Sequence, residues 1–333
     1  MYLRLEGTPV GSGRTQAIGD PVLRAAIVCG VDHSEGSRRA LRVAADLAER
    51  LDSRLLLVNV RRSPADVPPG MASELDVVRE RAAAGTRRLL ADLGAEFLEE
   101  SRASGLLELA AGRVEFGDPA SRLAAVADEV RATLIVVGSR GRGRTGSLLL
   151  GSVSQTVASA PSRPVLVVPP DAATETQRRG ARSGRPRSIV CGVDGSNHAA
   201  NAVRIAAQLA SALDVRLVLA HVEPDGGKAP TASIDLDTRL RGGTRTSLRI
   251  LQRAMDAVGD TEVEGTLVRG EPAASLGELA MRESAEMIAV GTRGHGALKA
   301  LVLGSVSRAL AATGPCPVLI VNDRPNQTPG ERC

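Results

Sequence analysis

Hydrophobic residues fall into short runs that alternate with longer stretches of mixed polarity along most of the chain. The β-branched and aliphatic runs predict buried strands, at 26–31, 55–60, 113–116, 133–137 and 164–168 in the first half and at 188–193, 216–222, 264–268, 286–290 and 317–321 in the second. Between the runs of the first half, helical spacing of apolar residues predicts helices at 37–51, about 71–93, 119–130 and 153–160. Near-continuous apolar strands separated by helices are typical of a parallel sheet covered on both faces, so the predicted fold class is α/β.

The chain contains an internal repeat of domain size. The hexapeptide Ile-Val-Cys-Gly-Val-Asp at 27–32 returns at 189–194. Two later landmarks, a Gly-Asp/Glu-Pro-Ala turn and a Val-Gly-Ser/Thr-Arg-Gly segment, also return in the same order. Since 333 residues accommodate two domains of ordinary size, we expect domains at 23–170 and 188–323, an Arg-rich linker at 171–187, a flexible extension at 1–22 and a tail at 324–333.

Aromatic residues are almost absent from the composition, with no Trp, one Tyr and two Phe. Proteins that bind single-stranded nucleic acids usually stack bases on aromatic side chains. The linker is basic, but it has neither aromatic residues nor a helical period, which favours a solvated connection over a binding segment. We therefore expect no nucleic-acid partner.

Lysine and cysteine usage excludes further classes of protein. Only Lys228 and Lys299 occur, and neither precedes Ser or Thr, so the phosphate loop G-x-x-x-x-G-K-[ST] is absent from the sequence. Cys29 and Cys191 lie within apolar runs, where a buried and inert thiol is expected. With no apolar run of membrane-spanning length and no signal-peptide pattern at residue 1, we expect a cytoplasmic protein without a membrane span.

The strongest candidate site follows the fourth predicted strand of each half, where the pattern G-x2-G-x9-G-S occurs at identical spacing. Glycines bring backbone N–H groups against an anion with no Cβ in the way, and the helix that begins after Gly-Ser favours phosphate through its dipole and its serine hydroxyls. A turn followed by an ordinary N-cap serine would explain one glycine pair, but not three glycines repeated at fixed spacing. The predicted nucleotide-binding residues here are Gly138, Ser139, Arg140, Gly141, Arg142, Gly143, Gly151, Ser152, Val153 and Ser154, and in the second half Gly291, Thr292, Arg293, Gly294, Gly304, Ser305, Val306 and Ser307.

Charged residues near these loops offer further contacts. Asp32 and Asp194 end the first strand of each half and could accept hydrogen bonds from a ribose hydroxyl or an exocyclic amine. The alternative is a helix N-cap or a turn residue. Arg140 and Arg293 match between the halves and could neutralise phosphate charge, although a solvated loop arginine is also compatible with this position. The histidines beside the loops do not match between the halves, so no metal site is expected.

Together these residues resemble the universal stress protein family in its tandem-domain, ATP-binding form. The resemblance is carried by the glycine pattern, the first-strand Gly-Val-Asp, the Gly-Asp/Glu-Pro-Ala turn and the closing Pro-Val-Leu strand, all present in both halves. It implies two Rossmann-like, doubly wound, parallel five-stranded sheets of strand order 3-2-1-4-5, paired as an intrachain pseudo-dimer. The residues that it implies at the adenosine are Asp32 and Asp194, Gly30 and Gly192, and the strand ends Val60 and Val222, whose backbone would contact adenine.

The resemblance also implies a function, namely a nucleotide-responsive stress regulator that binds ATP, with Mg²⁺, and acts on an unidentified protein partner. We expect no dedicated catalytic residues, because no acid/base pair repeats in both halves and phosphoryl transfer needs metal ligands and an oriented nucleophile as well as a phosphate cradle. Two alternatives stay open, a nucleotide-free adaptor and a slow ATPase or autophosphorylating protein. A homodimer is also compatible with the sequence. The acceptor serines of an autophosphorylating protein would be Ser152, Ser154, Ser305 or Ser307.

Overall fold

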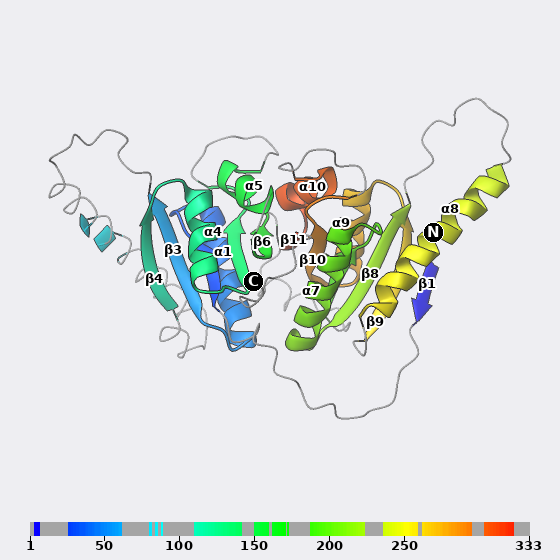
Figure 1. Ribbon diagram of the computed structural model, residues 1–333, viewed down its shortest axis with the longest axis horizontal. Helices are drawn as coiled ribbons and strands as arrows, with labels where there is room; N and C mark the ends of the chain where they lie inside the picture. The colour runs from blue at the N-terminus through cyan, green and yellow to red at the C-terminus, as the bar shows by residue number, and fades with distance from the viewer. Residues whose placement is uncertain are drawn as a thin grey trace, which may run out of the picture. The chain divides into compact units, whose positions relative to one another are not determined.

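The computed structural model describes residues 3–6, 26–61, 80–81, 84–85, 88, 110–141, 150–159, 162–170, 172, 187–223, 236–258, 262–294 and 303–322 (Figure 1). They belong to two compact units. The N-terminal unit is drawn from Ala17–Pro170, and the C-terminal unit from Asp171–Cys333 together with Met1–Gln16. The residues predicted to form a helix at 71–93 lie outside this description, apart from five positions at 80–81, 84–85 and 88 that are helical.

The N-terminal unit is a parallel sheet in the order β4-β3-β2-β5-β6. Numbered along the chain, this is the order 3-2-1-4-5, which confirms the prediction. Its strands are β2 (Ile27–Gly30), β3 (Leu55–Arg61), β4 (Ala110–Phe116), β5 (Leu134–Gly138) and β6 (Val165–Val168), and its helices are α1 (Glu35–Arg50), α4 (Pro119–Glu129) and α5 (Ser152–Ser159).

The C-terminal unit repeats this order as β9-β8-β7-β10-β11. Its strands are β7 (Ser188–Gly192), β8 (Arg216–Glu223), β9 (Val263–Arg269), β10 (Ala285–Gly291) and β11 (Val318–Val321), and its helices are α7 (Asn197–Leu213), α8 (Leu236–Asp256), α9 (Pro272–Arg282) and α10 (Ser305–Thr313).

A sixth strand, β1 (Leu3–Glu6), pairs antiparallel with β9 in the C-terminal unit. These four residues lie within the extension at 1–22 that the sequence analysis expected to be flexible, so that prediction is wrong for them. The prediction of five parallel strands is likewise incomplete for this unit. The physical reason is that β9 is an edge strand, whose unpaired N–H and C=O groups accept an added strand.

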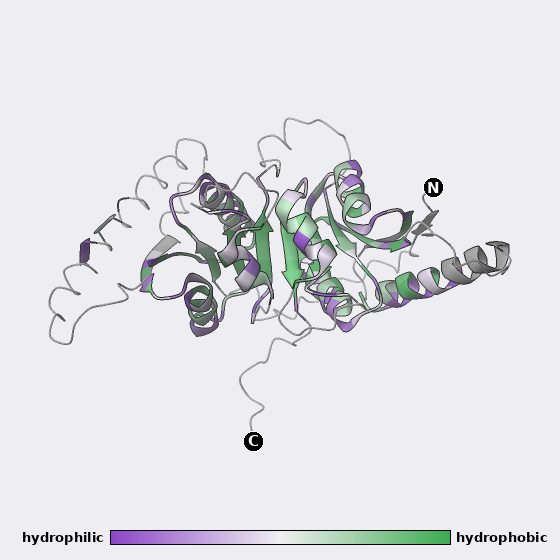
Figure 2. Ribbon diagram, turned by 90° about the horizontal axis from the view of Figure 1, so that it is seen from above, coloured by the Kyte–Doolittle hydropathy of each residue, from purple (hydrophilic) through white to green (hydrophobic). Residues whose placement is uncertain are grey.

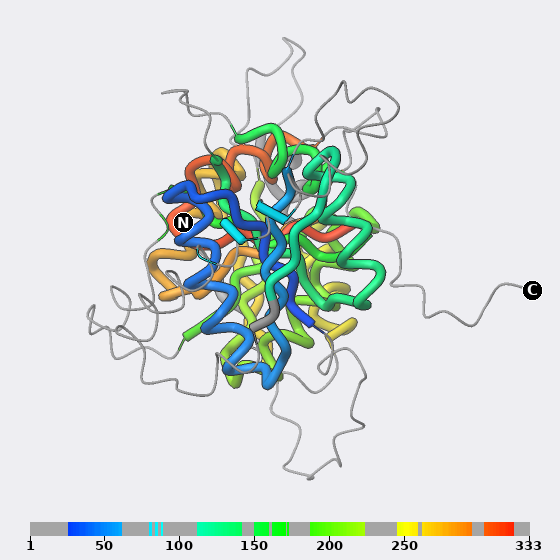
Figure 3. The backbone as a smooth tube through the Cα atoms, turned by 90° about the vertical axis from the view of Figure 1, so that its left-hand side faces the viewer, coloured from blue at the N-terminus to red at the C-terminus, as the bar shows by residue number. Residues whose placement is uncertain are grey.

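Helices cover both faces of each sheet. Figure 3 shows α1 and α4 on opposite sides of the sheet of the N-terminal unit, and α5 packs beside α4. The hydrophobic colour in Figure 2 is concentrated in the strands. Ile27, Val28 and Cys29 of β2 are fully buried. Burial raises the pKa of the Cys29 thiol to about 12, and that of Cys191 equally, so both are inert thiols as predicted.

Edge strand β4 is joined to α4 by a charged cluster around Glu115. The Glu115 side chain, 9% exposed, accepts hydrogen bonds from Arg113 and from Arg122, whose Nε lies 3.1 Å from Oε2. Burial acts to raise the pKa of Glu115, but the hydrogen bonds from Arg122 and Arg113 outweigh it and hold the pKa below its ordinary value. This cluster fixes α4, a wall of the site described below, to the sheet.

The depressed pKa of Glu115 predicts an acid-dependent loss of stability. The stabilisation is fully present above the pKa of an unfolded glutamate, about 4.3, and is lost as the pH falls through the lower pKa of the folded state. We expect the urea midpoint of the N-terminal unit to decrease as the pH is lowered below the pKa of an unfolded glutamate. Glu115→Gln should make this decrease smaller. Glu129→Gln is the control: the hydrogen bond from Arg113 also lowers the pKa of Glu129, but this side chain is exposed and such pairs stabilise little, so Glu129→Gln should change the decrease less. An unchanged acid limb in Glu115→Gln would contradict the prediction.

Candidate functional site

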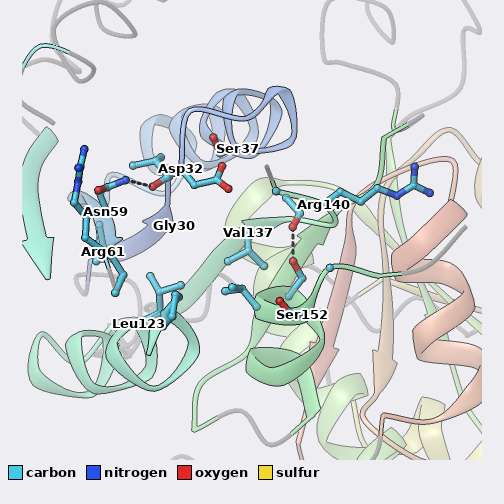
Figure 4. Close-up of a pocket in the computed structure, with 18 of the residues that line it drawn as sticks. Gly30, Asp32, Ser37, Asn59, Arg61, Leu123, Val137, Arg140 and Ser152 are labelled. Carbon is cyan, nitrogen blue, oxygen red and sulfur yellow. Dashed lines mark hydrogen bonds between the residues drawn. The ribbon is translucent and has the colours of Figure 1, made fainter. Parts of the chain in front are cut away.

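A cavity of about 730 Å³ lies at the carboxyl ends of β2, β3 and β5 in the N-terminal unit (Figure 4). This is the edge at which doubly wound sheets bind ligands. Its apolar wall comes from Val58, Pro119, Leu123 and Val137. Ten of the residues predicted from the sequence line it, namely Gly30, Asp32, Val60, Gly138, Arg140, Gly141, Gly151, Ser152, Val153 and Ser154.

Asp32 links the first strand to the glycine loop. Its Oδ1 accepts hydrogen bonds from the backbone N and the Oγ of Ser34, at 3.1 and 2.5 Å. Ser34 in turn is the N-cap of α1 and accepts from the Ser37 N–H. On the other side, a Cβ at Gly141 would lie 2.5 Å from Asp32 Oδ2. One carboxylate oxygen of Asp32 therefore accepts the hydrogen bonds of the turn, which was the alternative role predicted for this residue. The other oxygen lies against the glycine loop.

Backbone hydrogen bonds hold the glycine loop against the start of α5. The Gly151 N–H donates to the Ser139 carbonyl at 2.7 Å, and the first helical bond runs from Gln155 N–H to the Gly151 carbonyl at 2.8 Å. The amides of residues 152–154 precede that bond, as at the start of any helix, and these residues line the cavity. A helix start of this kind is a site for anions.

The hydroxyl groups of Ser154 and Ser307 are used inside the fold, which corrects their prediction as phosphate donors and phosphoryl acceptors. Ser154 is 4% exposed and its Oγ donates to the Gly138 carbonyl at 2.6 Å. Ser307 is 3% exposed and donates to the Gly291 carbonyl at the same distance. These bonds pin each helix to the end of its strand. Ser152 and Ser305, at the first helical position, are exposed.

Other predicted residues of the loop contribute differently. Arg140 lines the cavity, but its guanidinium points away from the other labelled side chains in Figure 4. A contact between this guanidinium and phosphate therefore stays a prediction. Ser139 is 1% exposed and does not line the cavity. Its N–H donates to the Val168 carbonyl. Arg142 and Gly143 lie outside the described residues.

The C-terminal unit repeats these connections. The Ser196 N–H donates to Asp194 Oδ1 at 2.9 Å, and a Cβ at Gly294 would overlap the other oxygen of Asp194. The Gly304 N–H donates to the Thr292 carbonyl at 2.8 Å. The structure thus places the predicted residues at the strand ends of β7, β8 and β10, in the loop after β10 and in the first turn of α10, namely Gly192, Asp194, Val222, Gly291, Thr292, Arg293, Gly294, Gly304, Ser305, Val306 and Ser307.

Sequence reasoning missed a matched pair of polar residues in the second strand of each unit. Asn59 is 3% exposed, and its Nδ2 donates to the Val31 carbonyl at 2.7 Å. His221 occupies the equivalent position, and its Nδ1 donates to the Val193 carbonyl at 2.7 Å. Each bond fixes the backbone immediately before the site aspartate. A polar residue between two apolar neighbours, at the same place in both strands, was a signal that could have found them.

Among the described residues, no three His, Cys, Asp or Glu side chains gather in a way that could hold a metal ion. No helix in those ranges combines the length and the apolar character needed to cross a bilayer.

Comparisons with known proteins agree with the architecture. The sequence model of the universal stress protein family matches residues 24–169 and 186–322. A universal stress protein of Mycolicibacterium smegmatis is 30% identical over 314 residues, which cover 90% of this chain and 97% of that protein. One of Mycobacterium tuberculosis is 29% identical over 310 residues, covering 88% and 94%. The crystal structure of a universal stress protein from Archaeoglobus fulgidus shares the fold, with a TM-score of 0.61, 22% identity and coverage of 90% and 97%.

Proposed function

The chain belongs to the universal stress protein family, and from this we propose that it binds an adenine nucleotide, ATP with Mg²⁺, in each half. In this proposal it works as a nucleotide-responsive regulator that transmits occupancy to a protein partner and does not turn over a substrate. A cytoplasmic location belongs to the same proposal.

The observation that carries the proposal is the division of the cavity into two chemically different ends. One end is formed by Gly138, Gly141 and the helix start at Gly151, where backbone N–H groups and the helix dipole favour phosphate. The other has apolar side chains, including Leu123, suited to the faces of a base. A volume of about 730 Å³ is within the range of small-molecule sites.

The residues present also fit a nucleotide-bound Mg²⁺. In proteins Mg²⁺ keeps several waters and takes one or two carboxylates together with substrate phosphates. Asp32 supplies a carboxylate that lines the cavity. Bound in this way, the ion would neutralise phosphate charge.

For the alternative of autophosphorylation, the structure bears on which serine could accept the phosphate, whereas slow ATP hydrolysis stays an open alternative. Of the four serines considered, Ser154 and Ser307 have buried hydroxyls that donate to backbone carbonyls. Only Ser152 and Ser305 are exposed as acceptors. Transfer would therefore leave phosphate on one of these two, and peptide mapping after long incubation with ATP distinguishes it from simple binding.

The test of the proposal is calorimetry with ATP, alongside native mass spectrometry of the purified full-length protein. We expect bound adenine nucleotide, with two sites per chain at saturation and no ADP accumulating. A protein that binds no ATP in either half would be the adaptor instead. ADP formation that a Gly141 or a Gly294 substitution abolishes would favour the slow ATPase, whereas ADP formation that survives both substitutions would point to a contaminating enzyme.

A further inference from the structure

Arg61 is a cavity residue that the sequence did not single out. It is the last residue of β3, follows the predicted adenine contact Val60, and is exposed at the rim beside Asn59 (Figure 4). Within the described part of the chain, no hydrogen bond or ion pair engages its guanidinium. The arginines of the neighbouring strand and helix, Arg113 and Arg122, are instead bound to Glu115.

The position of Arg61 corresponds to the base end of the cavity. Figure 4 shows Arg61 and Ser152 on opposite sides, with Leu123 and Val137 between them. If phosphates bind at the start of α5, as the proposed function requires, the base extends toward Arg61.

A guanidinium at this place supplies a planar group that the other described lining residues lack. Its described lining residues include no aromatic side chain, so none of them can stack a ring on a base. Arginine is planar and stacks on π-systems, which distinguishes it from lysine. We propose that the Arg61 guanidinium stacks on the purine and makes the N-terminal site the tighter of the two. This inference rests on the proposed nucleotide function.

The C-terminal unit has the opposite charge at the equivalent position. Glu223 ends β8 as Arg61 ends β3, and its Oε2 accepts a hydrogen bond from Arg269 Nε at 3.2 Å. Arg269 is the register partner of Glu223, whereas the partner of Arg61 is Phe116. In the C-terminal unit the Arg269 guanidinium is thus bound to the Glu223 carboxylate and is not available to stack on a base. At this pair of equivalent positions, the N-terminal unit therefore has a guanidinium without a described carboxylate partner, and the C-terminal unit has an arginine–glutamate pair.

The test measures ATP and inorganic tripolyphosphate affinity in the full chain carrying Ser305→Asp, which adds a negative charge at the phosphate end of the C-terminal site. Arg61→Met and Arg61→Lys should both weaken ATP binding about 10-fold, the effect of losing a partly exposed stacked cation. Neither should change tripolyphosphate affinity, because the stacked group acts on the base. Glu223→Gln is the matched control at the equivalent position and should leave ATP binding to the N-terminal site unchanged.

Three results would overturn the inference while leaving the proposed function intact. These are unchanged ATP affinity in Arg61→Met, full retention of affinity in Arg61→Lys, and an equal loss of tripolyphosphate binding. If the parent protein, without Ser305→Asp, binds no ATP at all, the proposed function fails first and the inference falls with it.

Discussion

Gly138→Ala should destabilise the N-terminal unit by about 3 kcal/mol, the upper range for overpacking a tight interior. Gly138 is the buried last residue of β5, and a Cβ there would lie 2.5 Å from both the carbonyl carbon and the carbonyl oxygen of Gly36. Both are backbone atoms in the first turn of α1, so relief requires the helix to move away from the strand. Because Gly138 also lines the cavity, nucleotide binding in this unit should be lost as well.

Urea unfolding followed by circular dichroism gives the size of the effect, and hydrogen exchange of peptides covering 26–61 locates it. The control is Gly277→Ala within α9, where a Cβ would lie at an ordinary 3.5 Å from Pro315 Cδ. That change should be neutral or stabilise by up to about 1 kcal/mol, because alanine is the better helix former. An unaltered midpoint for Gly138→Ala would mean that the strand and helix are less closely packed than described.

Ser152→Asp is expected to lower ATP affinity at the N-terminal site about 100-fold without harming the fold. Ser152 is exposed at the start of α5 and lines the cavity. An acidic residue in the first turn stabilises a helix by about 0.3–1 kcal/mol. The same charge about 5 Å from a phosphate, at an effective dielectric constant of about 20, repels it by about 3 kcal/mol.

Calorimetry in the Ser305→Asp background measures this loss at one site, and thermal unfolding checks that stability is kept. Gln155→Glu is the matched control, since it adds a charge to an exposed position later in the same helix that does not line the cavity. Equal ATP affinity in Ser152→Asp and the Gln155→Glu control would show that phosphate does not bind at the start of α5.

Much of this architecture could be predicted, because runs of apolar residues indicate buried strands and because each motif occurs in both halves of the sequence. Comparing the halves identified Asp32 and the glycines, which the structure brings together. The use of the Ser154 hydroxyl could not be predicted, since a serine in a first helical turn can face a ligand or the preceding strand equally well. Arg61 resembles any charged residue at a strand end until the sheet places it beside a cavity. The strand at Leu3–Glu6 was not predicted, because four residues are too few for an alternation of apolar and polar side chains to indicate a strand.

The pairing of β1 with β9 joins two segments that are far apart in the sequence. Leu3 lies opposite Leu267, so this edge can form only after the chain has been synthesised through β9. Closing so long a connection is entropically unfavourable, although the cost grows only logarithmically with length, and non-local pairings of this kind form late in folding. A tag fused before Leu3 is therefore attached to the edge of the C-terminal sheet, and its effects should be sought there rather than in the half of the sequence that it precedes.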